Sequence, residues 1–198
     1  MSTQALKHFQ TVDPVLAAAA EKVWPVELKW RPTKDFFSAL CNEIVSQQLS
    51  DKVADVLYHR LNQTCEGSIT AEIVTRLTDQ QLRDTGMSWS KVKFIKNLAE
   101  AVITQAIDLE QLTQFEDELV VTELTKLPGI GPWTAEMFLM FSLGRENVFS
   151  YGDLGLRRAI QKLYGLPPKP TRQQIEAITA KWSPYRTYAC LVLWKLGD

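Results

Sequence analysis

The residue of this sequence best suited to chemistry is Asp153, which follows an apolar and aromatic stretch and precedes a predicted helix. A carboxylate at the start of a helix accepts hydrogen bonds from free N–H groups, and the helix dipole favours its charged form. Such a carboxylate can stabilise the positive charge that builds on a sugar when a glycosidic bond breaks, and can orient or deprotonate an attacking water. The spacing alone fits equally well an N-cap with no chemical role, because Asp is common at that position.

A second candidate site is the string LPGIGPWTA at residues 127–135. One predicted helix, residues 119–126, ends there, and another, residues 132–143, begins. The two glycines permit a tight turn, and Ile130 between them is expected to fill the joint between the helices. The turn would aim the first N–H groups of the second helix outward, where they and the helix dipole attract an anion. An ordinary connector between two helices would contain the same glycine and proline residues.

The string LPGIGPWTA resembles the helix-hairpin-helix motif, which grips DNA phosphates without reading base sequence. Together with the following MFLMFSLGRENVF and GDLGLRRAI, it resembles the signature of the helix-hairpin-helix (HhH-GPD) superfamily of DNA glycosylases. Within that superfamily the 3-methyladenine DNA glycosylase II family is the most similar. Further segments extend the resemblance over residues 34–195, and these are Ile44–Ser50, Gly86–Ser88 with Lys91, and Trp182–Arg186.

This resemblance implies a DNA glycosylase that acts in base excision repair. Such an enzyme rotates a damaged base out of duplex DNA, hydrolyses its N-glycosidic bond and leaves an abasic site. The expected substrates are alkylated purines of the 3-methyladenine and 7-methylguanine type, and the expected catalytic residue is Asp153. The residues leave open which alkylated or deaminated bases are preferred.

The resemblance also implies which residues contact DNA. Hairpin residues would bind a phosphate, with a monovalent cation bridging hairpin carbonyl groups. Two glutamines fall where the family inserts a wedge into the space left by the flipped nucleotide, although polar residues at the end of an apolar helix are otherwise surface residues. The expected DNA-binding residues are Gly129, Ile130, Gly131, Thr134, Gln47 and Gln48.

Aromatic side chains are the candidates for the pocket that holds the flipped base. An electron-rich ring attracts a cationic alkylated purine by about 1–2 kcal/mol when the contact is desolvated. The pocket candidates are Trp133 and Tyr185, with Trp182 and Phe37 behind them. Each also has an ordinary interpretation as core packing, because aromatic residues at helical spacing are usually buried.

Two features of related glycosylases are absent from this sequence, and their absence narrows the predicted class of enzyme. Relatives that also cut the DNA strand carry a lysine two residues after the second hairpin glycine, and this sequence has Trp133 there, so water is the expected nucleophile and the glycosylase is expected to be monofunctional. An iron–sulfur cluster needs four cysteines, whereas this sequence has three. His8 and His59 lie in no metal-ligand pattern, so neither zinc nor another cofactor is expected.

Two alternative functions stay open on the sequence. A non-catalytic helix-hairpin-helix module would bind duplex DNA whether or not it is damaged, and would release no base. A glycosylase that is also a lyase, acting on another lesion, would use some other lysine, such as Lys126 before the hairpin.

Composition sets wider limits on function. The sequence is 45% hydrophobic and 23% charged, has no apolar run of membrane-spanning length, and carries a net charge of -1. From Tyr151 onward, however, eight Lys or Arg residues stand against three Asp or Glu, which fits either a DNA-facing surface or a solvated helix face. We expect a monomer that binds damaged double-stranded DNA and no membrane. We expect it in the cytoplasm, with the nucleoid if bacterial, or in the nucleus if eukaryotic.

The apolar residues recur at spacings of three and four, which predicts an all-α protein of about ten helices with no β domain. We expect one HhH-GPD domain over residues 1–198, with the helix-hairpin-helix at about residues 117–143. The N- and C-terminal helices are expected to pack as one of two lobes around a DNA-binding cleft. Capping residues predict helix starts at Asp13-Pro14, Ser50, Thr78, Thr171 and Ser183-Pro184.

Overall fold

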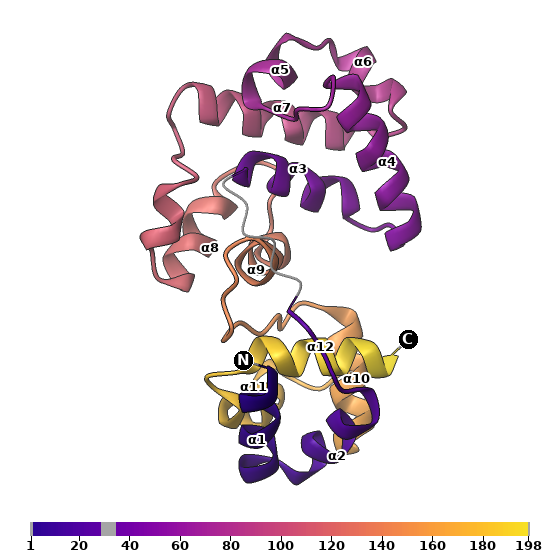
Figure 1. Ribbon diagram of the computed structural model, residues 1–198, viewed down its shortest axis with the longest axis vertical. Coiled ribbons are helices and arrows are strands. Elements are labelled where there is room, and N and C mark those ends of the chain that lie inside the picture. The colour runs from indigo at the N-terminus through magenta and orange to yellow at the C-terminus, as the bar shows by residue number, and fades with distance from the viewer. Residues whose placement is uncertain (1, 29–34, 198) are drawn as a thin grey trace. The chain divides into compact units, whose positions relative to one another are not determined.

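The computed structural model describes residues 2–28 and 35–197 of the chain. Within these ranges the chain forms twelve α-helices and two 3₁₀ helices, and no β-strand (Figure 1). The predicted all-α class is confirmed, with more helices than the sequence pattern indicated. An additional helix, α1 (Ser2–Val12), precedes the start predicted at Asp13-Pro14.

The described residues divide into two compact units. Residues 2–28 and 139–197 form the first unit, with α1, α2 (Pro14–Val23), α10 (Leu154–Tyr164), α11 (Arg172–Thr179), η2 (Ala180–Trp182) and α12 (Arg186–Gly197). Residues 35–138 form the second unit, with α3 (Phe36–Ser46), α4 (Asp51–Thr64), α5 (Ala71–Arg76), α6 (Asp79–Asp84), α7 (Trp89–Ile103), η1 (Gln111–Gln114) and α8 (Asp117–Thr125). The last helix, α9 (Pro132–Phe141), belongs to the second unit up to Phe138.

The buried carboxylate of Asp13 is the polar centre of the first unit. Its Oδ1 atom caps α2 by accepting hydrogen bonds from the backbone N–H groups of Val15 and Leu16, at 3.2 and 3.1 Å. Pro14 follows at the first helical position, where its missing N–H costs nothing. The helix start predicted at Asp13-Pro14 is therefore confirmed.

The other oxygen of Asp13 links α2 to the C-terminal part of the chain. Oδ2 accepts a hydrogen bond from the Tyr164 hydroxyl at 2.6 Å and from the Trp182 indole N–H at 2.7 Å, and lies 3.1 Å from Lys181 Nζ. Burial alone would raise the pKa of this carboxyl, but these hydrogen bonds, with that from the Leu16 amide, outweigh it and lower the pKa.

In the second unit, α3 packs against both α4 and α7. The buried side of α3 comprises Phe37, Leu40, Cys41, Ile44 and Val45. Lys91 of α7 donates hydrogen bonds from Nζ to the carbonyl oxygens of Val45 and Gln47, at 2.7 and 2.8 Å. It thereby satisfies carbonyl groups that the end of a helix leaves without a partner.

Only part of the apolar surface of α4 is buried. Val53 and Val56 are 45% and 46% exposed, whereas Ala54 and Leu61 are buried. Ser50 is the N-cap residue of α4, but its side chain makes no capping hydrogen bond. The spacing of the apolar residues therefore predicts this helix but does not by itself mark its buried side.

Two predicted capping boxes are confirmed, at Thr78 with Gln81 and at Thr171 with Gln174. The helix start predicted at Ser183 is wrong, because Ser183 is the C-cap of η2 and α12 begins at Arg186. The Tyr185 N–H bonds to the Trp182 carbonyl at 2.8 Å, so a turn around the buried Trp182 separates the two helices.

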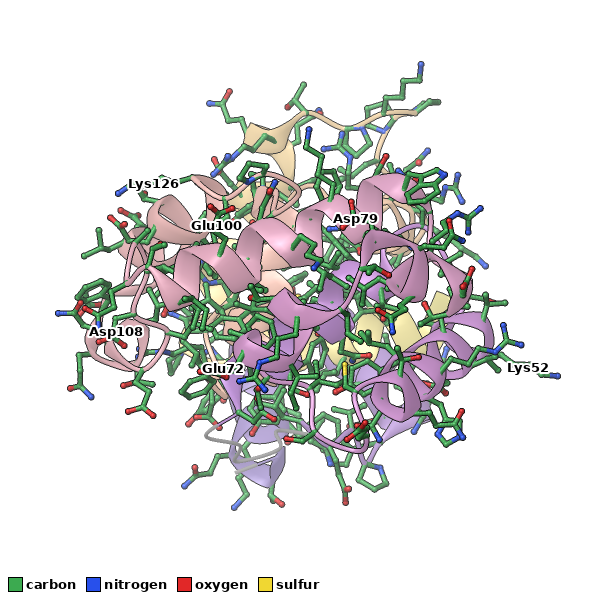
Figure 2. All side chains as sticks on the ribbon, turned by 90° about the horizontal axis from the view of Figure 1, so that it is seen from above. Lys52, Glu72, Asp79, Glu100, Asp108 and Lys126 are labelled. Atoms are coloured by element: carbon green, nitrogen blue, oxygen red, sulfur yellow. The ribbon has the colours of Figure 1, made fainter. Side chains whose placement is uncertain are left out.

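Charged side chains lie on the outside of the second unit (Figure 2). Exposed and labelled there are Lys52, Glu72, Asp79, Glu100, Asp108 and Lys126. No helix in the described ranges combines the length and apolar character needed to cross a membrane.

The Asp13 network predicts a stability change that depends on pH. Asp13→Asn removes the charge and directs amide hydrogens at donor groups, so we expect a loss of about 2–4 kcal/mol in the free energy of unfolding at pH 7. Because the pKa of Asp13 is lowered in the folded state, its stabilisation is present above the pKa of the unfolded chain and is lost as pH falls through the folded value. Urea unfolding of wild type and variant should therefore converge towards pH 3. A difference that stays constant from pH 7 to pH 3 would contradict this account.

Candidate DNA-binding hairpin and catalytic carboxylate

The turn between α8 and α9 is built around Gly129. Gly129 has a φ of +92°, which residues other than glycine rarely adopt. A Cβ atom at this position would lie 2.0 Å from the Phe94 ring. The Ile130 side chain is buried, as predicted for a residue that fills the joint between helices. The turn is therefore packed directly onto α7 through Phe94.

Gly131 has a different role from the one predicted. Its φ is not positive, and a Cβ atom there would meet nothing within 4 Å. Because Gly131 has no side chain and is exposed, it leaves the start of α9 accessible. The N–H groups in the first turn of a helix have no partners within that helix. Open space, N–H groups and the positive end of the helix dipole together form an arrangement that can receive an anion such as a phosphate.

The side chain of Gln47 braces this hairpin. Its Nε2 atom donates hydrogen bonds to the Gly129 carbonyl at 2.8 Å and to Thr134 Oγ1 at 3.1 Å. Thr134 is itself buried, so its hydroxyl belongs to the brace and only its backbone can serve a phosphate. The Gln47 amide is thus already committed inside the second unit, and the wedge role of Gln47 stays a prediction. Gln48 is exposed, with a φ of 58°, on the turn that follows α3.

Several carbonyl groups of the hairpin already accept hydrogen bonds. The Leu127 carbonyl accepts from the Ile130 N–H at 3.1 Å, and the Gly131 carbonyl accepts from the Ala135 N–H at 3.0 Å. A monovalent cation would have to share such oxygens, so it stays a prediction of the resemblance and the anion site does not depend on it. Within residues 2–28 and 35–197, no group of three or more His, Cys, Asp or Glu side chains is placed to hold a metal ion.

Asp153 is the N-cap of α10 and has one oxygen fixed by two donors. The Leu156 N–H donates to Oδ1 at 2.8 Å, and the Trp194 indole N–H from α12 donates to the same oxygen at 3.2 Å. Gly155 leaves room for this arrangement, because a Cβ atom there would lie 3.2 Å from Oδ1. The capping interpretation is confirmed, and it places a half-buried carboxylate at the positive end of a helix.

The loop before Asp153 is held by aromatic and arginine contacts. Arg157 donates hydrogen bonds to the carbonyl groups of Tyr151 and Pro170, at 3.3 and 2.6 Å. The Arg172 guanidinium lies 4.8 Å above the Tyr151 ring. The contacts join the loop before α10 to residues that follow this helix in the sequence. They fix the backbone that leads into Asp153.

Most basic side chains of the C-terminal quarter stabilise the first unit. Arg157 and Arg172 hold the loop, Lys181 pairs with Asp13, and Arg186 donates to Asn147 Oδ1 at 2.9 Å. Lys195 donates to the carbonyl groups of Val23 and Pro25. The charge excess is therefore largely structural, and the exposed remainder consists of Arg158, Lys162 and Lys169.

The predicted pocket residues are divided between the two units. Trp182 is fully buried and its indole N–H donates to Asp13, which favours its interpretation as a core residue. Phe37 is buried and lines a pocket of about 540 Å³ together with Asp35, Asp108 and Glu110, surroundings that disfavour a phosphate. Trp133 is half-buried in the second unit. Tyr185 is half-buried in the first unit, against His8 with ring centroids 5.5 Å apart.

Sequence reasoning missed Trp194. It lies in α12, half-buried, with its ring 6.1 Å from that of Phe141, and it is separated from Asp153 by 41 residues. No local spacing pattern connects an indole in the last helix to a carboxylate so far upstream. The one available signal was its place on α12, about two turns after the Trp182–Arg186 segment that the resemblance had already marked.

The sequence of this chain is similar to that of known proteins. Residues 41–184 match the HhH-GPD superfamily of base excision DNA repair proteins. The chain belongs to this superfamily. Among its members, the putative DNA-3-methyladenine glycosylase YfjP of Bacillus subtilis is 36% identical over 124 residues, which are 63% of this chain and 43% of that relative. The chain thus covers less than half the length of this curated relative.

Solved structures of the superfamily share the fold over almost the whole chain. A DNA-3-methyladenine glycosidase of Bacillus halodurans has 37% identity and a TM-score of 0.84, and the match covers 98% of this chain and 89% of that one. The Schizosaccharomyces pombe 3-methyladenine DNA glycosylase Mag1, solved in complex with abasic DNA, has 30% identity and a TM-score of 0.84, with coverage of 97% and 95%. The resemblance that the motifs indicated is therefore confirmed.

The two hairpin glycines should respond differently to alanine. Gly129→Ala drives a methyl group into Phe94 at a positive φ, so we expect a loss of about 2–4 kcal/mol in the free energy of unfolding. Gly131→Ala meets no atom, so its unfolding should match wild type while its affinity for duplex DNA falls, because the methyl group occupies the approach to the first N–H groups of α9. Thermal unfolding and fluorescence anisotropy with a labelled duplex measure the two effects. Equal destabilisation by both substitutions would show that the hairpin geometry is misassigned.

Proposed function

We propose that this protein is a monofunctional DNA glycosylase that hydrolyses the N-glycosidic bond of alkylated purines such as 3-methyladenine and 7-methylguanine. The observation that carries the proposal is the carboxylate of Asp153, fixed at the start of α10 by the Leu156 N–H and the Trp194 indole. Relatives named as 3-methyladenine glycosylases, one of them solved with abasic DNA, support the same activity. The protein would act in base excision repair wherever its genome lies, in the cytoplasm of a bacterium or the nucleus of a eukaryote.

Asp153 would supply the chemistry at the sugar. As the bond between C1′ and the purine nitrogen lengthens, positive charge develops on the deoxyribose, and an ionised carboxylate beside it lowers the energy of that state. The two N–H donors hold one oxygen in place, so little reorganisation is needed when the charge appears. Asp153 would then orient the attacking water and take its proton.

The hairpin would bind the DNA backbone. The open space at Gly131 and the first N–H groups of α9 suit a phosphate, and this contact is independent of base sequence. Of the two glutamines, exposed Gln48 is the better wedge candidate, because Gln47 braces the hairpin. Damaged double-stranded DNA is therefore the proposed partner.

Trp133 and Tyr185 are the proposed aromatic contacts of the flipped base. Both are half-buried, which leaves part of each ring accessible for stacking. A cationic methylpurine would gain about 1–2 kcal/mol from each well-placed ring when desolvated. Such a base is also a good leaving group, so the enzyme needs to assist the sugar more than the base.

Water, and not a lysine, is the proposed nucleophile. Trp133 occupies the position at which strand-cutting relatives carry lysine, and Lys126 Nζ pairs with Glu123 at 2.6 Å. Treatment of a reaction mixture with borohydride should trap no covalent DNA adduct, because no Schiff base forms. A trapped adduct would favour the lyase alternative.

Loss of the Asp153 charge should abolish base release. With methylated duplex DNA, wild type should release methylpurine, and Asp153→Asn should be slower by about 10²- to 10⁴-fold while unfolding as wild type does. Asp79→Asn, at an exposed position of α6, is the matched control and should retain full activity. Chromatography of the released bases measures the rates. Equal release by wild type and Asp153→Asn would refute the mechanism, and duplex binding without release by either would favour the non-catalytic module.

Removal of the Trp194 hydrogen bond should slow the same step. Trp194→Phe keeps an aromatic ring near Phe141 but lacks the indole N–H, so we expect kcat to fall by about 5- to 30-fold with KM within about twofold of wild type. Steady-state release of methylpurine gives both constants. A rise in KM with kcat unchanged would show that Trp194 contacts DNA or base and does not position Asp153.

A further inference from the structure

Leu154, the first residue of α10, exposes a larger fraction of its side chain than any other large apolar residue in the described part of the chain. The exposed fraction is 67%, and the next highest value is 56%, at Trp89. Single exposed apolar residues are common on protein surfaces and need no explanation by themselves. Leu154 differs from these in its position, because it directly follows Asp153.

The start of α10 does not require a leucine at this position. The side chain of Asp153 already caps the helix through the Leu156 N–H, and the buried Leu156 and Ile160 are the core residues of α10. The first turn of a helix favours proline and acidic residues. Neither capping nor packing therefore accounts for Leu154.

Glycines flank the pair formed by Asp153 and Leu154. Gly152 and Gly155 are both exposed, and a Cβ atom at Gly152 would meet nothing within 4 Å. Helix side chains tilt towards the N-terminus of their helix, so the Leu154 side chain projects at the end of α10 that the Asp153 carboxylate caps. A ligand can therefore approach the carboxylate and this apolar side chain without obstruction by their neighbours in the sequence.

The exposed face of α10 continues with positive charge. Arg158 and Lys162 follow Leu154 at intervals of four residues, and both are exposed. Residues at this spacing share one side of a helix and lie about 6 Å apart along its axis. The face therefore presents an apolar group first and cationic groups in the turns that follow.

This order matches the chemistry of a nucleotide in a DNA strand. Deoxyribose lacks a hydroxyl group at C2′, so its carbon atoms form an apolar surface, and charged phosphates flank it on both sides. Arginine suits phosphate because its guanidinium group can donate two parallel hydrogen bonds. If Asp153 stabilises charge on the sugar, that sugar must lie beside it, within reach of the next residue in the chain.

We propose that Leu154 packs against the deoxyribose of the damaged nucleotide, and that Arg158 binds an adjacent phosphate. This inference rests on the proposed glycosylase activity and assigns two further substrate contacts to it. The contact with Leu154 removes water from one side of the sugar and the carboxylate. With less water to screen them, the negative charge of Asp153 and the positive charge that develops at C1′ attract each other more strongly.

Leu154→Asn tests the apolar contact, because asparagine has nearly the shape of leucine but keeps water around it. With methylated duplex DNA, kcat/KM for the release of methylpurine should fall by about 10- to 30-fold. Leu154→Met should stay within about threefold of wild type, because methionine is apolar and similar in size. Since Leu154 is exposed, the melting temperatures of both variants should lie within about 2 °C of the wild-type value.

Arg158→Gln tests the phosphate contact. Its affinity for a labelled duplex should fall by about three- to tenfold, and the slope of log Kd against log salt concentration should decrease by about 0.9, the value for one phosphate contact. The rate of base release at saturating enzyme should stay within about twofold of wild type, because Arg158 touches no reacting atom. Fluorescence anisotropy over a salt series gives the affinities, and single-turnover release gives the rate.

The first unit offers a matched control for each substitution. Val15→Thr replaces an apolar residue that is 45% exposed on α2 by a polar residue of similar shape. Lys7→Gln removes an exposed positive charge from α1. Both controls should show wild-type release, affinity and salt dependence.

The outcomes separate this inference from the proposed function. If wild type releases methylpurine and Leu154→Asn does so equally fast, or if Leu154→Met is as slow as Leu154→Asn, Leu154 makes no such apolar contact and the proposed function stands. A salt slope that Arg158→Gln leaves unchanged would likewise overturn the phosphate contact alone. If wild type releases no methylpurine, the proposed function itself fails.

Discussion

The chemistry proposed for this protein depends on two hydrogen bonds to one oxygen atom. The Leu156 N–H and the Trp194 indole both donate to Oδ1 of Asp153, and they come from different helices of the first unit. The pair fixes both the position and the rotation of the carboxylate before any substrate binds, which is what electrostatic catalysis requires. The Arg157 contacts to the preceding loop and the hydrogen bond from Tyr164 to Asp13 act in support, because both hold α10, the helix that Asp153 caps.

In the second unit, hydrogen bonds and packing hold the hairpin that leads into α9. An anion site made of backbone N–H groups works only if the turn that presents them is rigid and its own polar atoms are satisfied. Gln47 satisfies the Gly129 carbonyl and the Thr134 hydroxyl, and Phe94 occupies the space that only glycine leaves open at position 129. The proposed phosphate site and the proposed catalytic carboxylate are thus each held by contacts within their own unit.

The sequence predicts well those features that depend on interactions between residues close together in the chain. The N-cap role of Asp153, the Asp13-Pro14 start and both capping boxes follow from hydrogen bonds that close within a few residues. Long-range contacts were not predictable in the same way. The burial of Trp182 depends on a hydrogen bond to a residue 169 positions away, and the commitment of Gln47 depends on a carbonyl 82 positions away.

The central claim is that the fixed charge of Asp153 stabilises a sugar cation. Binding of a duplex that contains a pyrrolidine, a cationic mimic of the sugar, tests it without any catalytic step, against a duplex with a neutral tetrahydrofuran at the same position. Wild type should bind the cationic duplex more tightly by about tenfold or more, and Asp153→Asn should lose that preference while binding the neutral duplex as wild type does. An equal preference in both proteins would contradict the account.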